Sequence, residues 1–189
     1  MSTKRIVTAL LLLACTAVAS WALWEKSPAE ERTEIQQMAG QALNDLYNLR
    51  PGARDYIRRS VGYAVFSTKG MKILVAGGTS GKGVLVERET GRKIYMRMAQ
   101  VNVGLGVGAQ DARFVFVFEN REAMDDFATQ GWDFSGQAGV TAAQKGEGAN
   151  AAGALSFMPG VMAYQFTKNG LSAELTVQGT KFWAEEKWN

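Results

Sequence analysis

The stretch GVLVERETGRKIYMRM, Gly83 to Met98, decides the fold class. Its two halves have the alternating apolar pattern of β-strands, and Glu89-Thr90-Gly91-Arg92 between them has the composition of a tight turn. We therefore predict a β-hairpin here. Similar short segments lie on both sides of it, namely YAVFS, KILVAG, VNVGLGVGA and RFVFVFE. Several short strands in succession predict an antiparallel sheet.

The residues just before the hairpin, VAGGTSGKGVLV (Val75 to Val86), invite comparison with a phosphate-binding loop. Such a loop reads G-x-x-x-x-G-K-[ST] and opens a helix whose N-terminus attracts the phosphate. Here Ala76 replaces the first glycine, Gly83 replaces the hydroxyl residue, and a strand follows. We expect no nucleotide and no other cofactor. We interpret the glycines as bracketing a turn: Gly77, Gly78, Gly81 and Gly83.

Two helices are expected before the strands. The segment SPAEERTEIQQMAGQALNDLYNLRPG has Ser27 as N-cap, Pro28 at the first helical position and Glu30 to complete a capping box. Its apolar residues recur at helical spacing: Ile35, Met38, Ala42, Leu43, Leu46 and Leu49. A short second helix, ARDYIRRS, follows. We expect its apolar side inward and its arginines outward: Tyr56 and Ile57 inward, and Arg54, Arg58 and Arg59 outward.

A further amphipathic helix, NREAMDDFATQG, interrupts the strands, capped by Asn120 and ended by Gly131. Strands resume in DFSGQAGVTAA, ALSFMPGVMAYQFT and LSAELTV, with KNG as a turn. The predicted fold class is α+β: an antiparallel, barrel-like curved β-sheet with N-terminal helices and one amphipathic helix inserted between strands.

One predicted strand has glycine at every second position, at Gly104, Gly106 and Gly108. Alternate residues of a strand share a face, so these glycines form a strip without side chains. Such a strip permits close packing of a neighbouring element or close approach of a ligand such as an acyl chain.

Residues 1–26 precede the folded domain, which we place at 27–189. MSTKR is basic, and residues 6–24 contain no charge. This pattern fits a lipoprotein signal with Cys15 as the lipidated residue, a cleaved secretory peptide, or an uncleaved membrane anchor. Each alternative predicts an exported protein, in the periplasm or associated with the outer membrane.

The composition argues against an enzyme. The chain has no histidine and only one cysteine, Cys15, which excludes histidine-based catalysis, histidine-ligated zinc and an internal disulfide. We expect no metal site. Catalysis by the carboxylates Asp111, Asp125 or Asp126 stays open as the weakest alternative, since no paired-acid pattern stands out.

Positive charge is concentrated in residues 50–97. The whole chain carries a net charge of +3, yet this block has eleven basic residues and only Asp55, Glu87 and Glu89 as acids. If the block folds compactly, one face attracts anionic surfaces such as membranes. The alternative is a solvated face balanced by acids from elsewhere in the fold. We expect no nucleic acid for an exported domain.

The ordered blocks SVGYAVFS, AGGTSGKGVLV, VNVGLGVGAQ, FVFVFENREAMDDF and AYQFTKNGLSAELTVQG resemble those of the SYLF family, over about Ala29 to Trp188. The resemblance implies binding of phospholipid or phosphoinositide headgroups through basic residues and an amphipathic N-terminal segment, without catalysis. The actin binding of yeast relatives is not expected in an exported bacterial domain. Two places depart from the family pattern: Ser67 replaces a proline, and Trp183 and Trp188 lie where relatives end differently.

We therefore expect a non-enzymatic module of the bacterial cell envelope that docks on anionic phospholipids. The alternative is a structural or protein-interaction lipoprotein of the envelope with no specific lipid site. The candidate lipid-binding residues are Arg54, Arg58, Arg59, Lys69, Lys72 and Lys82, together with the glycine strip.

Overall fold

The computed structural model describes residues 26–68, 78–101, 112–135, 141–142, 153–167, 170–171, 175–177 and 179–189. Its helices are α2 (Pro28–Leu49), α3 (Gly52–Arg59), α4 (Arg121–Gln130) and the 3-10 turn η1 (Glu186–Trp188). Its strands are β1 (Gly62–Ser67), β2 (Gly78–Glu87), β3 (Lys93–Val101), β4 (Arg113–Phe118), β5 (Trp132–Asp133), β6 (Thr141–Ala142), β7 (Leu155–Met158), β8 (Val161–Thr167), β9 (Gly170–Leu171), β10 (Leu175–Thr176) and β11 (Thr180–Ala184). None of the helices in these ranges combines the length and the hydropathy needed to cross a bilayer.

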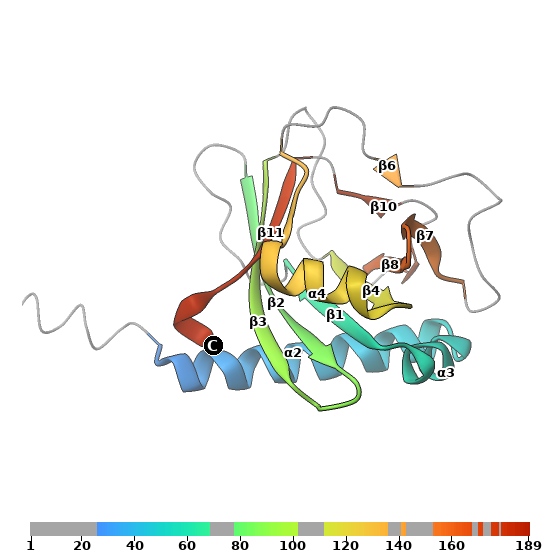
Figure 1. Cartoon of the computed structure of the whole chain (residues 1–189), viewed down its shortest axis with the longest axis horizontal. Coiled ribbons are helices and arrows are strands. Elements are labelled where there is room, and N and C mark those ends of the chain that lie inside the picture. The colour runs from blue at the N-terminus through green and yellow to red at the C-terminus, as the bar shows by residue number, and fades with distance from the viewer. Residues whose placement is uncertain are drawn as a thin grey trace, which may run out of the picture.

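The strands form one curved antiparallel sheet and a small separate pair. The large sheet has the order β5-β11-β3-β2-β1-β4-β8-β7, with β9 beside β8, and β6 pairs with β10. Helix α2 runs across one face of the sheet, and α4 lies on the other (Figure 1). The predicted α+β class, with N-terminal helices and a curved antiparallel sheet, is confirmed.

The central strands β1 and β4 are buried on both faces. Phe66 and Phe116 point to the face that carries α4, whereas their neighbours Val65 and Val115 point to the face that carries α2 and α3. Side chains alternate between the faces of a strand, so a strand covered on both sides needs apolar residues at every position. This requirement explains the uninterrupted apolar run in β4.

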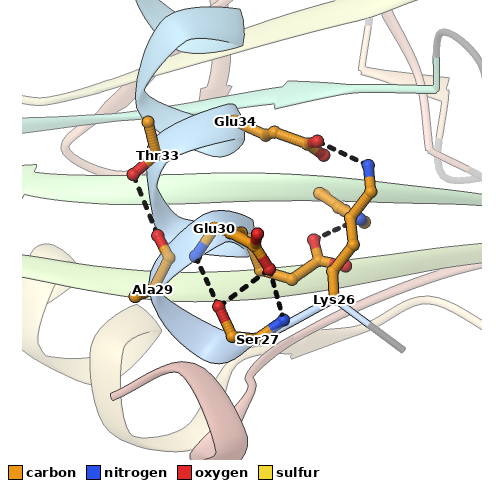
Figure 2. A network of polar contacts seen from close by, with 8 residues as sticks. Lys26, Ser27, Ala29, Glu30, Thr33 and Glu34 are labelled. Atoms are coloured by element: carbon orange, nitrogen blue, oxygen red, sulfur yellow. Dashed lines mark hydrogen bonds and ion pairs between the residues drawn. The ribbon is translucent and has the colours of Figure 1, made fainter. Parts of the chain in front are cut away.

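Helix α2 begins at the predicted capping box, which Figure 2 shows in detail. The Glu30 N–H donates to Ser27 Oγ at 3.3 Å, and the Ser27 N–H donates to Glu30 Oε2 at 2.8 Å. Two N–H groups that the helix itself cannot satisfy are thereby paired. Nearby, Lys26 Nζ donates to Glu34 Oε1 at 2.5 Å.

The apolar side of α2 was predicted almost correctly. Ile35, Ala42 and Leu46 are buried against the sheet, and each such aliphatic side chain larger than alanine contributes about 1.5–3 kcal/mol. Leu49 is a correction, since it is 36% exposed. It lies at the last position of α2, where the chain turns toward α3 and leaves the sheet surface.

Aromatic rings fill the α4 side of the sheet. The ring of Phe116 packs edge-on against Trp132 and Phe182, with 5.0 and 5.4 Å between ring centroids. The ring of Phe127, from α4, packs against Trp132 with 4.1 Å between centroids. Helix α4 is capped by Asn120 and ends at Gly131, as predicted. Gly131 has φ +67°, and a Cβ there would lie 2.1 Å from the Phe182 carbonyl oxygen, so only glycine fits.

The described glycines before the hairpin do not bracket a turn, which corrects our interpretation for them, while Gly77 lies outside the described residues. Gly78, Gly81 and Gly83 belong to the continuous strand β2. A Cβ at Gly83 would lie 2.2 Å from the Phe66 ring, so glycine is present because an aromatic side chain occupies the space above it. The strand predicted after Lys82, which argued against a phosphate-binding loop, is confirmed.

Two further strand predictions need correction. ALSFMPGVMAYQFT is a hairpin, not one strand: β7 and β8 pair with each other, and Pro159 and Gly160 form the turn between them. LSAELTV is not one strand either: among its described residues, Leu171 belongs to β9 of the large sheet, and Leu175–Thr176 form β10 of the small pair. Of the two C-terminal residues that depart from the family pattern, Trp183 lies in β11, which pairs with β3 and β5 inside the large sheet, and Trp188 lies in η1.

Candidate functional site

Five arginines surround α3 and form what we call the α3 arginine cluster: Arg50, Arg54, Arg58, Arg59 and Arg88. All five are exposed. The local sequence explains their orientation, because Ala53 and Ile57 are buried and anchor one side of α3 on the sheet. The opposite side of this short helix therefore carries its arginines into solvent.

Arg88 comes from the β2–β3 turn and is attached to the end of α3. Its Nη2 donates to the Arg58 carbonyl oxygen at 3.2 Å, which satisfies one of the carbonyl groups left unpaired at the helix end. A positive side chain at this C-terminal end also interacts favourably with the negative partial charge of the helix dipole. This contact brings a residue from another part of the sheet into the cluster.

Most of the cluster has no acidic partner among the described residues. Arg58 pairs with Asp55 at 3.3 Å, but both side chains are more than 60% exposed, so this pair is weak. No described carboxylate lies within 4.0 Å of Arg50, Arg54, Arg59 or Arg88. Arg54 instead stacks over the Tyr47 ring at 4.4 Å. Where the structure describes the chain, the positive charge of this surface is therefore largely uncompensated.

Three tyrosines lie beneath or beside these arginines and do not reduce the charge. Burial is the main cause that raises the pKa of Tyr47 and of Tyr63 above 10.0, and burial raises the pKa of Tyr164 to about 12. Near neutral pH their hydroxyls stay protonated. The electrostatic character of the cluster is therefore set by the guanidinium groups.

A cleft of about 330 Å³ opens where α3 ends, between the β2–β3 turn and the start of α4. It is lined by Arg58, Ser60, Val61, Arg88, Glu89 and Arg121. Its volume lies at the lower end of the range for small-ligand sites. Three arginines against one glutamate give its lining a formal charge of +2, so its chemistry suits an anion.

Lys82, another predicted lipid-binding residue, is not part of this cluster. It forms an ion pair with Glu31 in the first turns of α2 and lies 5.6 Å from the centre of the Trp188 ring. Glu31 and Arg50 are nineteen positions apart along α2, or about 28 Å at 1.5 Å per residue. Among the described basic residues of the block 50–97, Lys82 therefore does not share a surface with the α3 arginine cluster.

The other described basic residues of that block have polar partners. Arg92 pairs with Glu87 and Arg97 pairs with Glu185, whereas Lys93 donates to the neutral side chain of Gln36. The remaining predicted residues lie outside the described part of the chain: Cys15, Lys69, Lys72, Gly104, Gly106, Gly108 and Asp111.

The alternative carboxylate chemistry finds little structural support where the structure describes its residues. Asp126 is exposed on α4 and accepts from Gln130 at 3.4 Å, and Asp125 is half-buried on the same helix. Within the described ranges, no group of three His, Cys, Asp or Glu side chains is placed to hold a metal ion.

Sequence reasoning missed two contributors to the cleft. Arg88 was counted in the basic block but not chosen, because the end of a strand gives no sign of which helix it will meet. Arg121 stands in the acidic half of the chain, at the start of α4, and no local signal marks it. Only the packing of α4 beside the β2–β3 turn brings it to this place.

Comparison with known proteins gives two findings. Residues 99–189 match the family model Ysc84, described as "Las17-binding protein actin regulator". Beta cell expansion factor A of Aeromonas veronii is 31% identical over 161 residues, which cover 85% of this chain and 60% of that protein. The chain therefore spans about 60% of the length of this curated relative.

Proposed function

Since this chain belongs to the SYLF (Ysc84) family, which is lipid-binding in general, we propose that it docks on anionic phospholipid headgroups through the α3 arginine cluster. In this proposal the module is non-enzymatic and acts at the bacterial cell envelope. The actin regulation named for the family model is not part of the proposal.

The observation that carries the proposal is the set of exposed arginines without nearby described carboxylates. A guanidinium that is already paired must break its ion pair before it binds a phosphate, which costs free energy. Arg54 and Arg59 form no ion pair with any described residue, so they bind without that cost. Guanidinium groups also match phosphate oxygens in geometry, because they offer parallel N–H donors.

The size of the effect follows from the number of charges. A basic residue close to an anionic leaflet contributes about 1 kcal/mol, and this contribution is lost beyond a Debye length of about 8 Å at physiological salt. Reversing the charge of two cluster arginines should therefore weaken binding by at least about 2 kcal/mol, or about thirty-fold.

The test uses residues 26–189, which contain every described helix and strand, in co-sedimentation with phosphatidylglycerol-containing vesicles. We expect Arg54→Glu combined with Arg59→Glu to lose most binding at low salt. The matched control combines Lys26→Glu with Lys187→Glu, which changes the net charge equally at the other end of α2 and should retain binding. Circular dichroism checks that all variants are folded.

Equal losses in both double variants would mean that net charge alone governs binding, and would refute a role for α3. If the unaltered domain fails to bind anionic vesicles at any salt concentration, the proposal fails as a whole. The alternative, a protein-interaction or structural envelope component, would then be preferred.

The envelope location is proposed on the basis of residues 1–26, with their basic start and uncharged run. Anchoring through Cys15 would hold the domain beside a membrane and raise its effective concentration there. The intact mass of the protein extracted from membranes tests this. A chain that begins at Cys15 with a diacylglyceryl group supports lipidation, and an unmodified Cys15 excludes it.

A further inference from the structure

We infer that the cleft between α3, the β2–β3 turn and α4 binds a phosphomonoester group, and that Glu89 occupies its key arginine until that group arrives. This inference rests on the proposed function, because it specifies which headgroup the domain prefers. Its main evidence lies in the contacts of Arg121, which is not part of the α3 arginine cluster, although Arg58 and Arg88 of that cluster also line the cleft.

Arg121 is held in a fork by two glutamates that differ greatly in exposure. Its Nη1 donates to Glu87 Oε1 and its Nη2 donates to Glu89 Oε2, both at 2.7 Å. The Glu87 side chain is 6% exposed, whereas the Glu89 side chain is 78% exposed. Glu87 therefore fixes the guanidinium, while the Glu89 contact faces water and is easily exchanged.

Glu87 does not depend on Arg121 alone. It also accepts from Thr90 Oγ1 at 2.8 Å and from Arg92 Nε at 3.2 Å. These contacts stay in place when Glu89 moves away. The guanidinium of Arg121 would then present Nη2 to the cleft in a fixed orientation, as a preorganised anion-binding group requires.

The other two arginines that line the cleft are Arg58 and Arg88. Arg88 is positioned by its bond to the Arg58 carbonyl, which uses only Nη2 and leaves its remaining N–H groups for a ligand. Ser60 contributes no donor, because its hydroxyl is directed at the carbonyl oxygens of Ile57 and Gly62. Anion recognition in this cleft therefore depends on guanidinium groups.

The charge of the lining selects the class of ligand. When Glu89 is displaced, the cleft and the groups paired with its arginines hold Arg58, Arg88, Arg92 and Arg121 against Glu87 and Asp55, a net charge of +2. This charge matches a phosphomonoester dianion better than a phosphodiester with a single charge. Phosphatidic acid carries such a monoester, and free inorganic phosphate presents a similar dianionic phosphate without the ester bond. The shared chemistry is the terminal phosphate, and the experiment separates its two sources.

The decisive variant is Glu89→Gln, which removes the competing carboxylate at an exposed position and should leave the fold intact. Because an exposed ion pair of this kind is weak, we expect phosphomonoester binding to tighten by about two- to five-fold. The control is Glu122→Gln, which changes the charge equally near Arg121 but does not line the cleft, and should change affinity by less than the Glu89 variant. Arg121→Gln and Arg88→Gln should each weaken binding by about ten-fold or more.

Binding is measured by NMR on residues 26–189 with three soluble probes: dibutanoyl phosphatidic acid, dibutanoyl phosphatidylglycerol and inorganic phosphate. We expect the monoester lipid to bind more tightly than the diester. Equal affinity for both lipids, or equal effects of the Glu89 and Glu122 variants, would overturn the inference. Inorganic phosphate that binds as tightly as phosphatidic acid supports the site and identifies soluble phosphate as its source.

Vesicles separate this inference from the proposed function. If vesicles of phosphatidic acid and phosphatidylglycerol with matched surface charge bind equally, and Arg121→Gln changes nothing, the cleft is refuted while membrane docking by α3 stands. If the soluble probes show the expected pattern but no anionic vesicle binds the domain, the docking proposal fails and the phosphomonoester site stands.

Discussion

Replacing Trp188 with alanine should strongly destabilise the whole domain, although Trp188 is the second-last residue of the sequence. Its side chain is 1% exposed and belongs to the core between α2 and the sheet. Arg97 lies 4.7 Å from the ring centre and Lys82 lies 5.6 Å from it. Large-to-small changes of buried aromatic residues cost about 3–5 kcal/mol. For a domain of this size that loss lowers Tm by roughly 6–20 °C.

The assay is denaturant unfolding followed by far-UV circular dichroism, because fluorescence would lose one of its own reporters in this variant. Glu186→Ala is the control: it alters an exposed residue of the same turn and should change stability by less than about 0.5 kcal/mol. A loss below about 1 kcal/mol for Trp188→Ala would show that the C-terminal segment is not part of the cooperative core, and the reasoning would be refuted.

Two further predictions concern packing and pH. Gly83→Ala should lower the free energy of unfolding by about 1–3 kcal/mol, because the new Cβ overlaps the Phe66 ring. Gly40→Ala should raise it by about 0.5–1 kcal/mol, because nothing lies within 4 Å of a Cβ at this exposed position of α2. Urea unfolding of both variants checks the opposite signs. Hydrogen bonds from Thr90 and then Arg121 hold the pKa of Glu87 below its usual 4.5, so its charged form contributes stability above about pH 4.5 that is lost as the pH falls through the lowered pKa. Glu87→Gln should therefore be less stable than the unaltered domain at about pH 7, with a difference that shrinks in acid; a constant difference down to about pH 2 would contradict this assignment.

The two proposals assign different tasks to neighbouring arginines. Arg54 and Arg59 lie on the open surface of α3, where attraction to a charged leaflet is long-ranged and weakly selective. Arg121 lies in a cleft, where its orientation is fixed by Glu87 and its second contact is with an exposed carboxylate. Membrane attraction and headgroup selection are thus expected to respond to different substitutions, which makes them separable by experiment.

Local features of the fold could be predicted because their causes lie within a few residues. The capping box at Ser27 and Glu30, the N-cap at Asn120 and the turn that joins β2 to β3 each depend on side chains that contact their own neighbours. The alternating apolar pattern likewise reflects the geometry of a strand. Such signals survive in the sequence regardless of what the element packs against.

Which charged residues lie together in the candidate site could not be predicted from the sequence, because it depends on tertiary packing. Lys82 and the α3 arginines belong to one basic block in sequence, yet the rigid length of α2 separates them by about 28 Å, and Glu31 takes Lys82 as its partner. Arg121, from an acidic part of the chain, joins Arg58 and Arg88 because α4 packs beside the β2–β3 turn. The sequence by itself determined the helices α2, α3 and α4, the β2–β3 hairpin and the outward orientation of the α3 arginines. The strand order and the path of α2 across the sheet decided which charges meet, because contacts between distant residues are set by packing and leave no local pattern.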